Sequence, residues 1–175
     1  DMKNKNLTRK IAVTGMMCAL ALALSYLETL IPAYLGFPPG AKPGLSNIVT
    51  MFMASCAGSG YAFFITIIKG LFAGVTRGMT AMLMSLSGGI LSTAAACLLF
   101  GFCKNKLGYI GIGIICAVCH NIGQLAAACI ISGTASLIVG YGPLLLIFAI
   151  VTGFLTGTIL KAVMPPLEKI AKFKN

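Results

Sequence analysis

The 175-residue chain is too apolar and too poor in charge to cover itself with a soluble surface. Hydrophobic residues make up 58% of it and charged residues 9%, whereas a soluble domain carries ~25% charged residues. The exterior must therefore face lipid, where backbone polar groups are paired within helices or closed barrels. Barrel strands alternate apolar and polar residues, but the apolar runs here are continuous. We predict an all-α polytopic membrane protein, with one transmembrane domain over 1–175.

Six apolar segments follow one another along the chain, each bounded by residues that interrupt a helix. The first has the ~20 residues that a membrane span needs, and the stretch 32–44 after it holds four prolines and three glycines, which forbid a helix. We expect Pro165 and Pro166 to end the last helix. The predicted helices, with both termini in the cytoplasm, are 11–31, 45–57, 61–75, 81–100, 109–131 and 137–164.

The net charge of +10 is a topology signal and does not indicate a nucleic-acid partner. Ten of the 13 basic residues fall into three clusters, before the first segment, between the fourth and fifth, and at the C-terminal end. Cytoplasmic segments of membrane proteins are enriched in Lys and Arg. With six spans all three clusters lie on the cytoplasmic side, where they meet anionic lipid. The expected location is a multi-pass position in a bacterial cytoplasmic membrane.

The hexapeptide "CAVCHN" (116–121) contains C-x-x-C-H, the spacing of a covalent haem site. It lies near the middle of the fifth segment, where a helix inside the bilayer offers neither access nor room for haem attachment. Most of the seven cysteines lie inside apolar runs. This favours small core residues over disulfide partners. We therefore expect no haem, no metal and no other cofactor.

Small residues recur at the spacing that lets helices approach closely. Gly70, Gly74 and Gly78 form one such series, and Gly153 with Gly157 forms another. We favour contacts between helices of this chain for both glycine series. Ala19 and Ala23 in the first segment have the same spacing, and they suit either an internal contact or a partner subunit.

Polar residues inside or next to the apolar segments form the candidate site, because such groups are costly in lipid unless they face a cavity or a partner. Most map to the outer half and middle of the bundle, which suits a ligand pocket open to the outside. Simpler alternatives remain for three of them. Glu28 and Lys69 could neutralise each other as a buried pair, and His120 could bond a neighbouring helix. The candidate residues are Glu28, Lys42, Asn47, Lys69, Arg77, His120, Asn121 and Gln124.

Within this site, Lys42 and the N-terminus of the second helix would meet an anionic group, and Ser46 or Asn47 could cap that helix. Amide and imidazole side chains would supply neutral hydrogen bonds, while Glu28 or Lys69 would set the charge. The Gly- and Pro-rich segment 32–44 would close the pocket.

Four motifs resemble the Gx transporter family, which also carries the description heptaprenyl diphosphate synthase component I: "SYLETLIP" (25–32), "KPGLSNIVT" (42–50), "SLSGGILS" (85–92) and "HNIGQL" (120–125). That family is related by fold to the substrate-binding S-components of energy-coupling-factor (ECF) transporters, six-helix proteins that work with a membrane scaffold and ATPase subunits. The resemblance implies that Ala19 and Ala23 contact such a partner. The family motif has small residues where Cys116 and Cys119 stand, so the C-x-x-C is incidental.

Composition argues against an enzyme. The acidic residues number three, Asp1, Glu28 and Glu168, whereas polyprenyl diphosphate synthesis needs carboxylate clusters that hold magnesium. The sequence also lacks a G-x-x-x-x-G-K-[ST] phosphate loop. An acid–base pair of Glu28 and His120 is the remaining catalytic alternative, without a nucleophile or metal cluster to join it.

Two functions follow. The first is a solute-binding membrane subunit that captures a small anionic, vitamin-like or isoprenoid-like molecule from outside, with uptake driven by a separate ATPase module. The second is a non-catalytic membrane subunit of isoprenoid or quinone biosynthesis, or of a flavin- and quinone-linked electron-transfer assembly.

Overall fold

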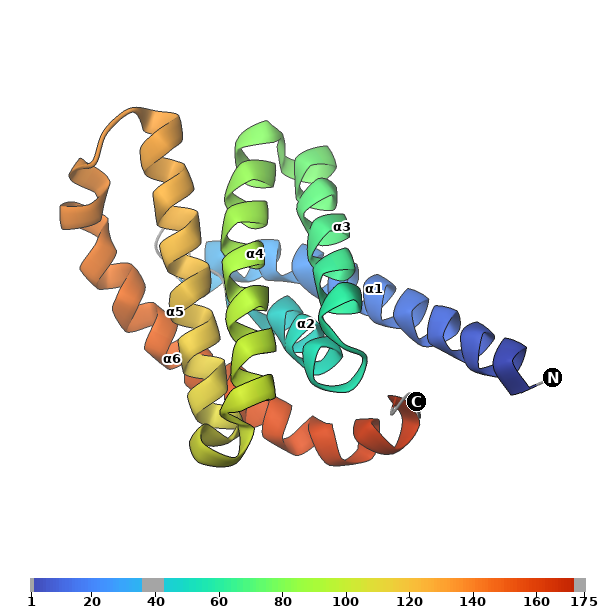
Figure 1. Ribbon diagram of the computed structural model, residues 1–175. Coiled ribbons are helices and arrows are strands. Elements are labelled where there is room, and N and C mark those ends of the chain that lie inside the picture. Colours follow the sequence, from blue (N-terminus) through green and yellow to red (C-terminus); the bar gives the residue numbers. More distant parts are fainter. Residues whose placement is uncertain (1, 36–42, 172–175) are drawn as a thin grey trace.

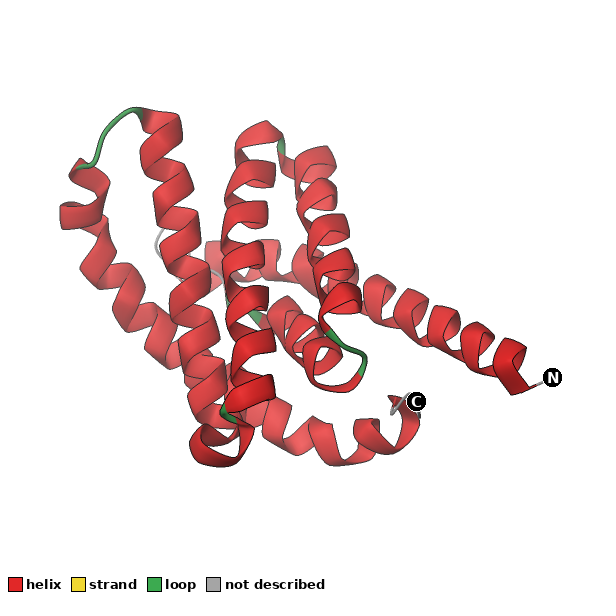
Figure 2. Cartoon of the chain, in the orientation of Figure 1, coloured by secondary structure: helices red, strands yellow, loops and turns green. Residues whose placement is uncertain are grey.

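The computed structural model describes residues 2–35 and 43–171, and these residues form six helices and no strand (Figures 1 and 2). The prediction of an all-α bundle is confirmed, and each predicted apolar segment lies within one helix or differs from it by a single residue. The helices are α1 (Met2–Leu35), α2 (Leu45–Cys56), α3 (Ser59–Arg77), α4 (Met79–Phe102), α5 (Lys104–Ser132) and α6 (Ser136–Ala171).

Five of these helices are long and apolar enough to cross a membrane, and α2 is the exception. Its 12 residues extend about 18 Å at ~1.5 Å per residue, against a hydrocarbon core of roughly 30 Å. Large apolar side chains cover the outside of the long helices, and Ile130 and Val139 are each 82% exposed. Such a surface is stable against lipid and not against water.

The helices α3, α4, α5 and α6 pack in sequence order, and their connections alternate between two ends of the bundle (Figure 1). The α3–α4 connection at Gly78 and the α5–α6 connection at 133–135 lie at one end, here named the Arg77 end. The α2–α3 and α4–α5 connections lie at the other, the Cys103 end. Gly78 has φ 91°, a conformation that glycine adopts without strain, and this allows α4 to begin one residue after α3.

Glycines bring the backbones of neighbouring helices into contact. A Cβ atom on Gly113 would lie 2.6 Å from the carbonyl oxygen of Gly153 and 2.7 Å from the Cα of Gly157. Gly70 and Gly74 face Leu86 and Met82 of α4. The predicted internal role of the two series is confirmed, except that Gly78 ends α3 and has nothing within 4 Å of such a Cβ.

The expectation that Pro165 and Pro166 end the last helix is wrong. Helix α6 continues through both prolines to Ala171, and it contains Pro143 as well. A proline inside a helix removes one hydrogen bond and clashes with the preceding turn, so it bends the helix without always stopping it. Figure 1 shows the C-terminal part of α6 turning beneath the bundle at the Cys103 end.

The short helix α2 lies at the centre of the core. Met51, Phe52 and Met53 are almost completely buried, and α2 contacts α1, α3, α4 and α6. Because α2 is enclosed, its N-terminus is also held inside the bundle. The polar residues of the candidate site gather around that N-terminus.

Candidate functional site

The N-terminus of α2 is bound by a carboxylate from α1. The backbone N–H of Ser46 donates to Glu28 Oε1 at 2.8 Å, and the Ser46 hydroxyl donates to Glu28 Oε2 at 3.0 Å. Glu28 is 2% exposed, and a negative charge is favourable where a helix leaves its first N–H groups unpaired. The predicted cap is wrong, because Gly44 is the N-cap residue and no side chain caps the helix locally.

Lys69 of α3 completes this hydrogen-bonded cluster. Its Nζ donates to Asn47 Oδ1 at 2.6 Å and to Ser46 Oγ at 3.3 Å, and the side chain is 3% exposed. Ser46 therefore connects the two buried charges, since it donates to Glu28 and accepts from Lys69. Glu28 and Lys69 neutralise each other through this serine and not through a direct ion pair.

A small cavity of about 20 Å³ adjoins the cluster, and we name it the polar cavity. Every helix from α1 to α5 contributes to its wall. A volume of this size holds about one water molecule, so it can accept a small polar group but not a whole vitamin-sized molecule. Its lining residues are Ser25, Glu28, Gly44, Ser46, Asn47, Lys69, Ser85, His120 and Gln124.

Glycines of α4 and α5 place His120 and Gln124 at this cavity. A Cβ atom on Gly88 would lie 2.7 Å from both Gln124 Cγ and the His120 carbonyl oxygen, and one on Gly123 would lie 2.8 Å from Gly88 Cα. The two backbones touch here because neither glycine has a side chain. As a result both polar side chains of α5 are pressed between the helices.

The Gln124 amide is buried but makes no hydrogen bond with any residue that the structure describes. Its side chain is 7% exposed, and it is absent from the described hydrogen-bonded residues. An amide presents two donors and an oxygen with two lone pairs. Gln124 can therefore offer several hydrogen bonds to a group that enters the cavity.

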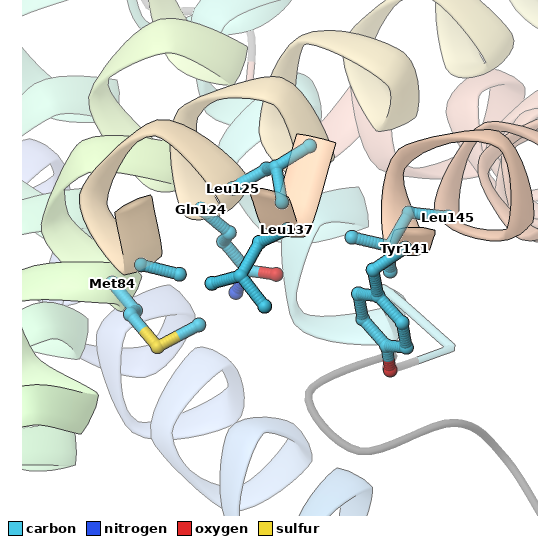
Figure 3. A pocket seen from close by; sticks show the side chains of 7 residues that line it. Met84, Gln124, Leu125, Leu137, Tyr141 and Leu145 are labelled. Carbon is cyan, nitrogen blue, oxygen red and sulfur yellow. The ribbon is translucent and has the colours of Figure 1, made fainter. Parts of the chain in front are cut away.

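Gln124 also lines a larger pocket of about 290 Å³, which we name the apolar pocket. Figure 3 shows Met84, Gln124, Leu125 and Leu137 on one side of the pocket in this view, and Tyr141 with Leu145 on the other. The remaining lining residue is Ala128. Gln124 therefore stands between a polar and an apolar compartment.

The structure brings together five of the eight predicted residues, Glu28, Asn47, Lys69, His120 and Gln124. Their role in binding a ligand stays a prediction. Two others, Arg77 and Asn121, do not line the polar cavity, and the third is not described. Arg77 is exposed at the end of α3, Asn121 Nδ2 donates to the Leu145 carbonyl at 3.0 Å, and Lys42 lies outside the described residues.

Sequence reasoning missed Ser25 and Ser85 as members of this site, and it gave Ser46 a different role. Ser25 lies three residues before Glu28 and so shares its helix face, a signal that the sequence does contain. Ser85 has no comparable signal. The part of Ser46 as a bridge depends on the contact between α1 and α2, which the sequence pattern does not reveal.

The structure also describes the cysteines and the two small residues of α1 that were predicted to lie outside the ligand site. Cys116 is buried within α5, and all seven cysteines are free thiols. Ala19 and Ala23 are exposed on α1. They are therefore not packed between described helices, and this face of α1 is open to a partner.

Fold and cavity together define the class: an all-α polytopic membrane protein with a buried polar site among its helices. A family model described as heptaprenyl diphosphate synthase component I matches residues 17–163. The chain belongs to this family, as its four motifs predicted. Comparisons with curated proteins and with solved structures give no match.

Proposed function

We propose that the chain is the substrate-binding subunit of a membrane uptake system. In this proposal it takes a small molecule from the outer side of a bacterial cytoplasmic membrane, and a separate ATPase module drives transport. The observation that carries it is the buried polar cavity beside an apolar pocket, with Gln124 shared by both. Ionisable residues inside a membrane bundle mark substrate or ion sites by default.

The charges around the cavity favour a ligand without net charge. Glu28 already occupies the positive end of α2, where an anionic group of the ligand was expected. Lys69 and Glu28 carry opposite charges and are linked through Ser46. The described lining of the polar cavity therefore has no unbalanced charge that would attract a charged ligand. An anionic ligand would therefore depend on Lys42 for a positive charge.

The need for a partner follows from the sequence and from the surface of α1. The given sequence contains no phosphate loop, and in this proposal an ATPase on another subunit drives transport. Ala19 and Ala23 expose small side chains on α1, and Gly15 lies four residues before Ala19 on the same face. Such a face lets a second helix approach closely, which suits the membrane scaffold of an ECF-type module.

We also infer that the chain does not catalyse a reaction. Its three acidic residues cannot form the carboxylate clusters of a prenyl synthase. Glu28 is the acidic residue in the membrane region, and both of its oxygens are bonded to Ser46. The carboxylate is therefore committed to holding α2.

The family description supports a second candidate, a non-catalytic membrane subunit that docks a prenyl synthase or a flavin- and quinone-linked assembly. In that case the clustered lysines would bind anionic lipid or an acidic partner. The polar cavity would then serve only to hold the helices together.

Mild-detergent affinity purification from native membranes, followed by native mass spectrometry, separates the two. Co-purification of a membrane scaffold with two ATPase subunits is the result that the uptake proposal expects. A soluble prenyl synthase or a flavoprotein in their place would refute it and support the docking role. The double variant Ala19→Leu/Ala23→Leu should lose the scaffold, while Ile130→Leu on α5 serves as the control.

A further inference from the structure

We propose that the ligand of this site is an amphiphile dissolved in the membrane, with a small uncharged polar head and a hydrocarbon tail. It enters sideways between α5 and α6, its tail fills the apolar pocket, and its head bonds Gln124 at the polar cavity. This inference rests on the proposed function for the site but names the class of substrate and its route.

The division into two compartments sets the shape of the ligand. The polar cavity of about 20 Å³ accepts one small group, such as a hydroxyl or a carbonyl. The apolar pocket of about 290 Å³ is roughly twice the size of a ~150 Å³ protein cavity that binds benzene. A molecule that fills both is therefore mostly hydrocarbon.

The hydrogen bonds of the residues that line the polar cavity indicate which kind of polar head the ligand has. Glu28 and Lys69 are satisfied within the chain, whereas the buried Gln124 amide has no described partner. An uncharged group that donates or accepts hydrogen bonds would satisfy this amide without bringing an unpaired charge into the bundle.

The separation of α5 from α6 sets the route. Near the Cys103 end the two backbones touch, because a Cβ on Gly153 would lie 2.6 Å from the Cα of Ile114. Nearer the Arg77 end a Cβ on Gly142 would first meet the Leu125 side chain, at 3.5 Å. Figure 1 shows α5 and α6 diverging toward their connection at 133–135.

A second pocket, of about 390 Å³, opens on this wedge between α5 and α6. It shares Leu125 and Leu145 with the apolar pocket, and its other lining residues include Ile138, which is exposed on the apolar surface of α6. The two shared leucines are thus the barrier between the two pockets. A hydrocarbon tail can pass this barrier without leaving an apolar environment.

The test uses the full-length protein in phosphatidylcholine nanodiscs and monodecanoylglycerol with a diazirine in its acyl chain. Photolysis marks the residues beside the tail, and peptide mass spectrometry locates them. We expect saturable labelling of Leu125, Leu137 and Leu145, displaced by excess monodecanoylglycerol but not by glycerol. Non-saturable labelling, equally dense at the exposed Ile130 and Val139, would show ordinary lipid contact and overturn the inference.

Three variants sharpen the result. Ala128→Trp fills the apolar pocket and should lower saturable labelling at least tenfold. Gln124→Leu removes the head contact and should raise the half-saturating concentration about tenfold, which corresponds to ~1.4 kcal/mol. Ile130→Trp adds the same bulk to the exposed face of α5 and should change neither value. Unchanged labelling in both pocket variants, with native elution and melting temperature, would also overturn the inference.

These outcomes are independent of the transport partner. Saturable labelling without co-purifying ATPase subunits would keep the amphiphile site and remove the uptake role. Co-purifying ATPase subunits without saturable labelling would do the reverse.

Discussion

Removing the charge of Lys69 is the sharpest test of the buried cluster. Lys69→Met keeps the length of the side chain but deletes two hydrogen bonds, to Asn47 and to Ser46. It also removes the positive charge that is linked through Ser46 to the Glu28 carboxylate, which is 2% exposed. Loss of one partner of a buried ionic pair costs ~3–5 kcal/mol, so we expect the free energy of unfolding to fall by about that amount.

A double-variant cycle shows whether the loss comes from Glu28. Glu28→Gln keeps an acceptor for the Ser46 N–H and removes the negative charge. If the two charges compensate each other through Ser46, the double variant loses less than the sum of the single variants. The expected difference lies at the upper end of the ~0.5–3 kcal/mol seen for coupled neighbours.

The assay is unfolding in mild detergent with increasing fractions of sodium dodecyl sulfate, followed by circular dichroism. Lys161→Met is the control, because it removes a lysine charge on α6 that is exposed, and exposed substitutions change stability by ~0.5 kcal/mol or less. Additive losses, or a Lys69→Met protein as stable as the control, would contradict the linkage through Ser46.

Three further predictions concern other parts of the chain. Gly113→Leu should lower stability by more than ~2 kcal/mol, as overpacking does, because its Cβ would meet the Gly153 backbone, whereas Gly111→Ala should be tolerated; thermal unfolding checks both. Cys116→Ala should cost under ~2 kcal/mol, since a buried methyl-sized loss leaves a small cavity, and the purified protein should show no haem absorbance before or after the change. Lys42→Ala should leave the half-saturating concentration of monodecanoylglycerol within twofold of wild type; a larger loss would indicate an anion-binding role for this lysine.

The fold was predictable because lipid imposes simple rules on sequence. Each helix contains a continuous apolar run, and the breaks at Gly58, Gly78 and Gly133 have positive φ angles that glycine adopts readily. Prediction failed at Pro165 and Pro166, through which α6 continues. The shortness of α2 was visible in the sequence, because the predicted segment 45–57 has fewer than the ~20 residues of a membrane span.

The candidate site was predictable only in its polar half. Glu28, Lys69, His120 and Gln124 are conspicuous because polar groups are rare and costly in apolar runs. The apolar pocket is not, because Leu125, Leu137 and Leu145 read like any lipid-facing residues. Its existence depends on how far α5 and α6 diverge, which is set by glycine contacts elsewhere along the helices.

The hydrogen bonding of Gln124 distinguishes a ligand-binding site from a polar cluster that only holds helices together. If the polar cavity only joined helices, its wall would bond internally, as Glu28 and Lys69 do. The Gln124 amide instead makes no hydrogen bond within the described part of the chain, and a ligand can supply one. Gln124→Leu should therefore not lower the stability of the ligand-free protein, while it should weaken amphiphile binding about tenfold. Both quantities can be measured on one preparation, by detergent unfolding and by photolabelling, and a variant that loses both stability and binding would show a structural amide.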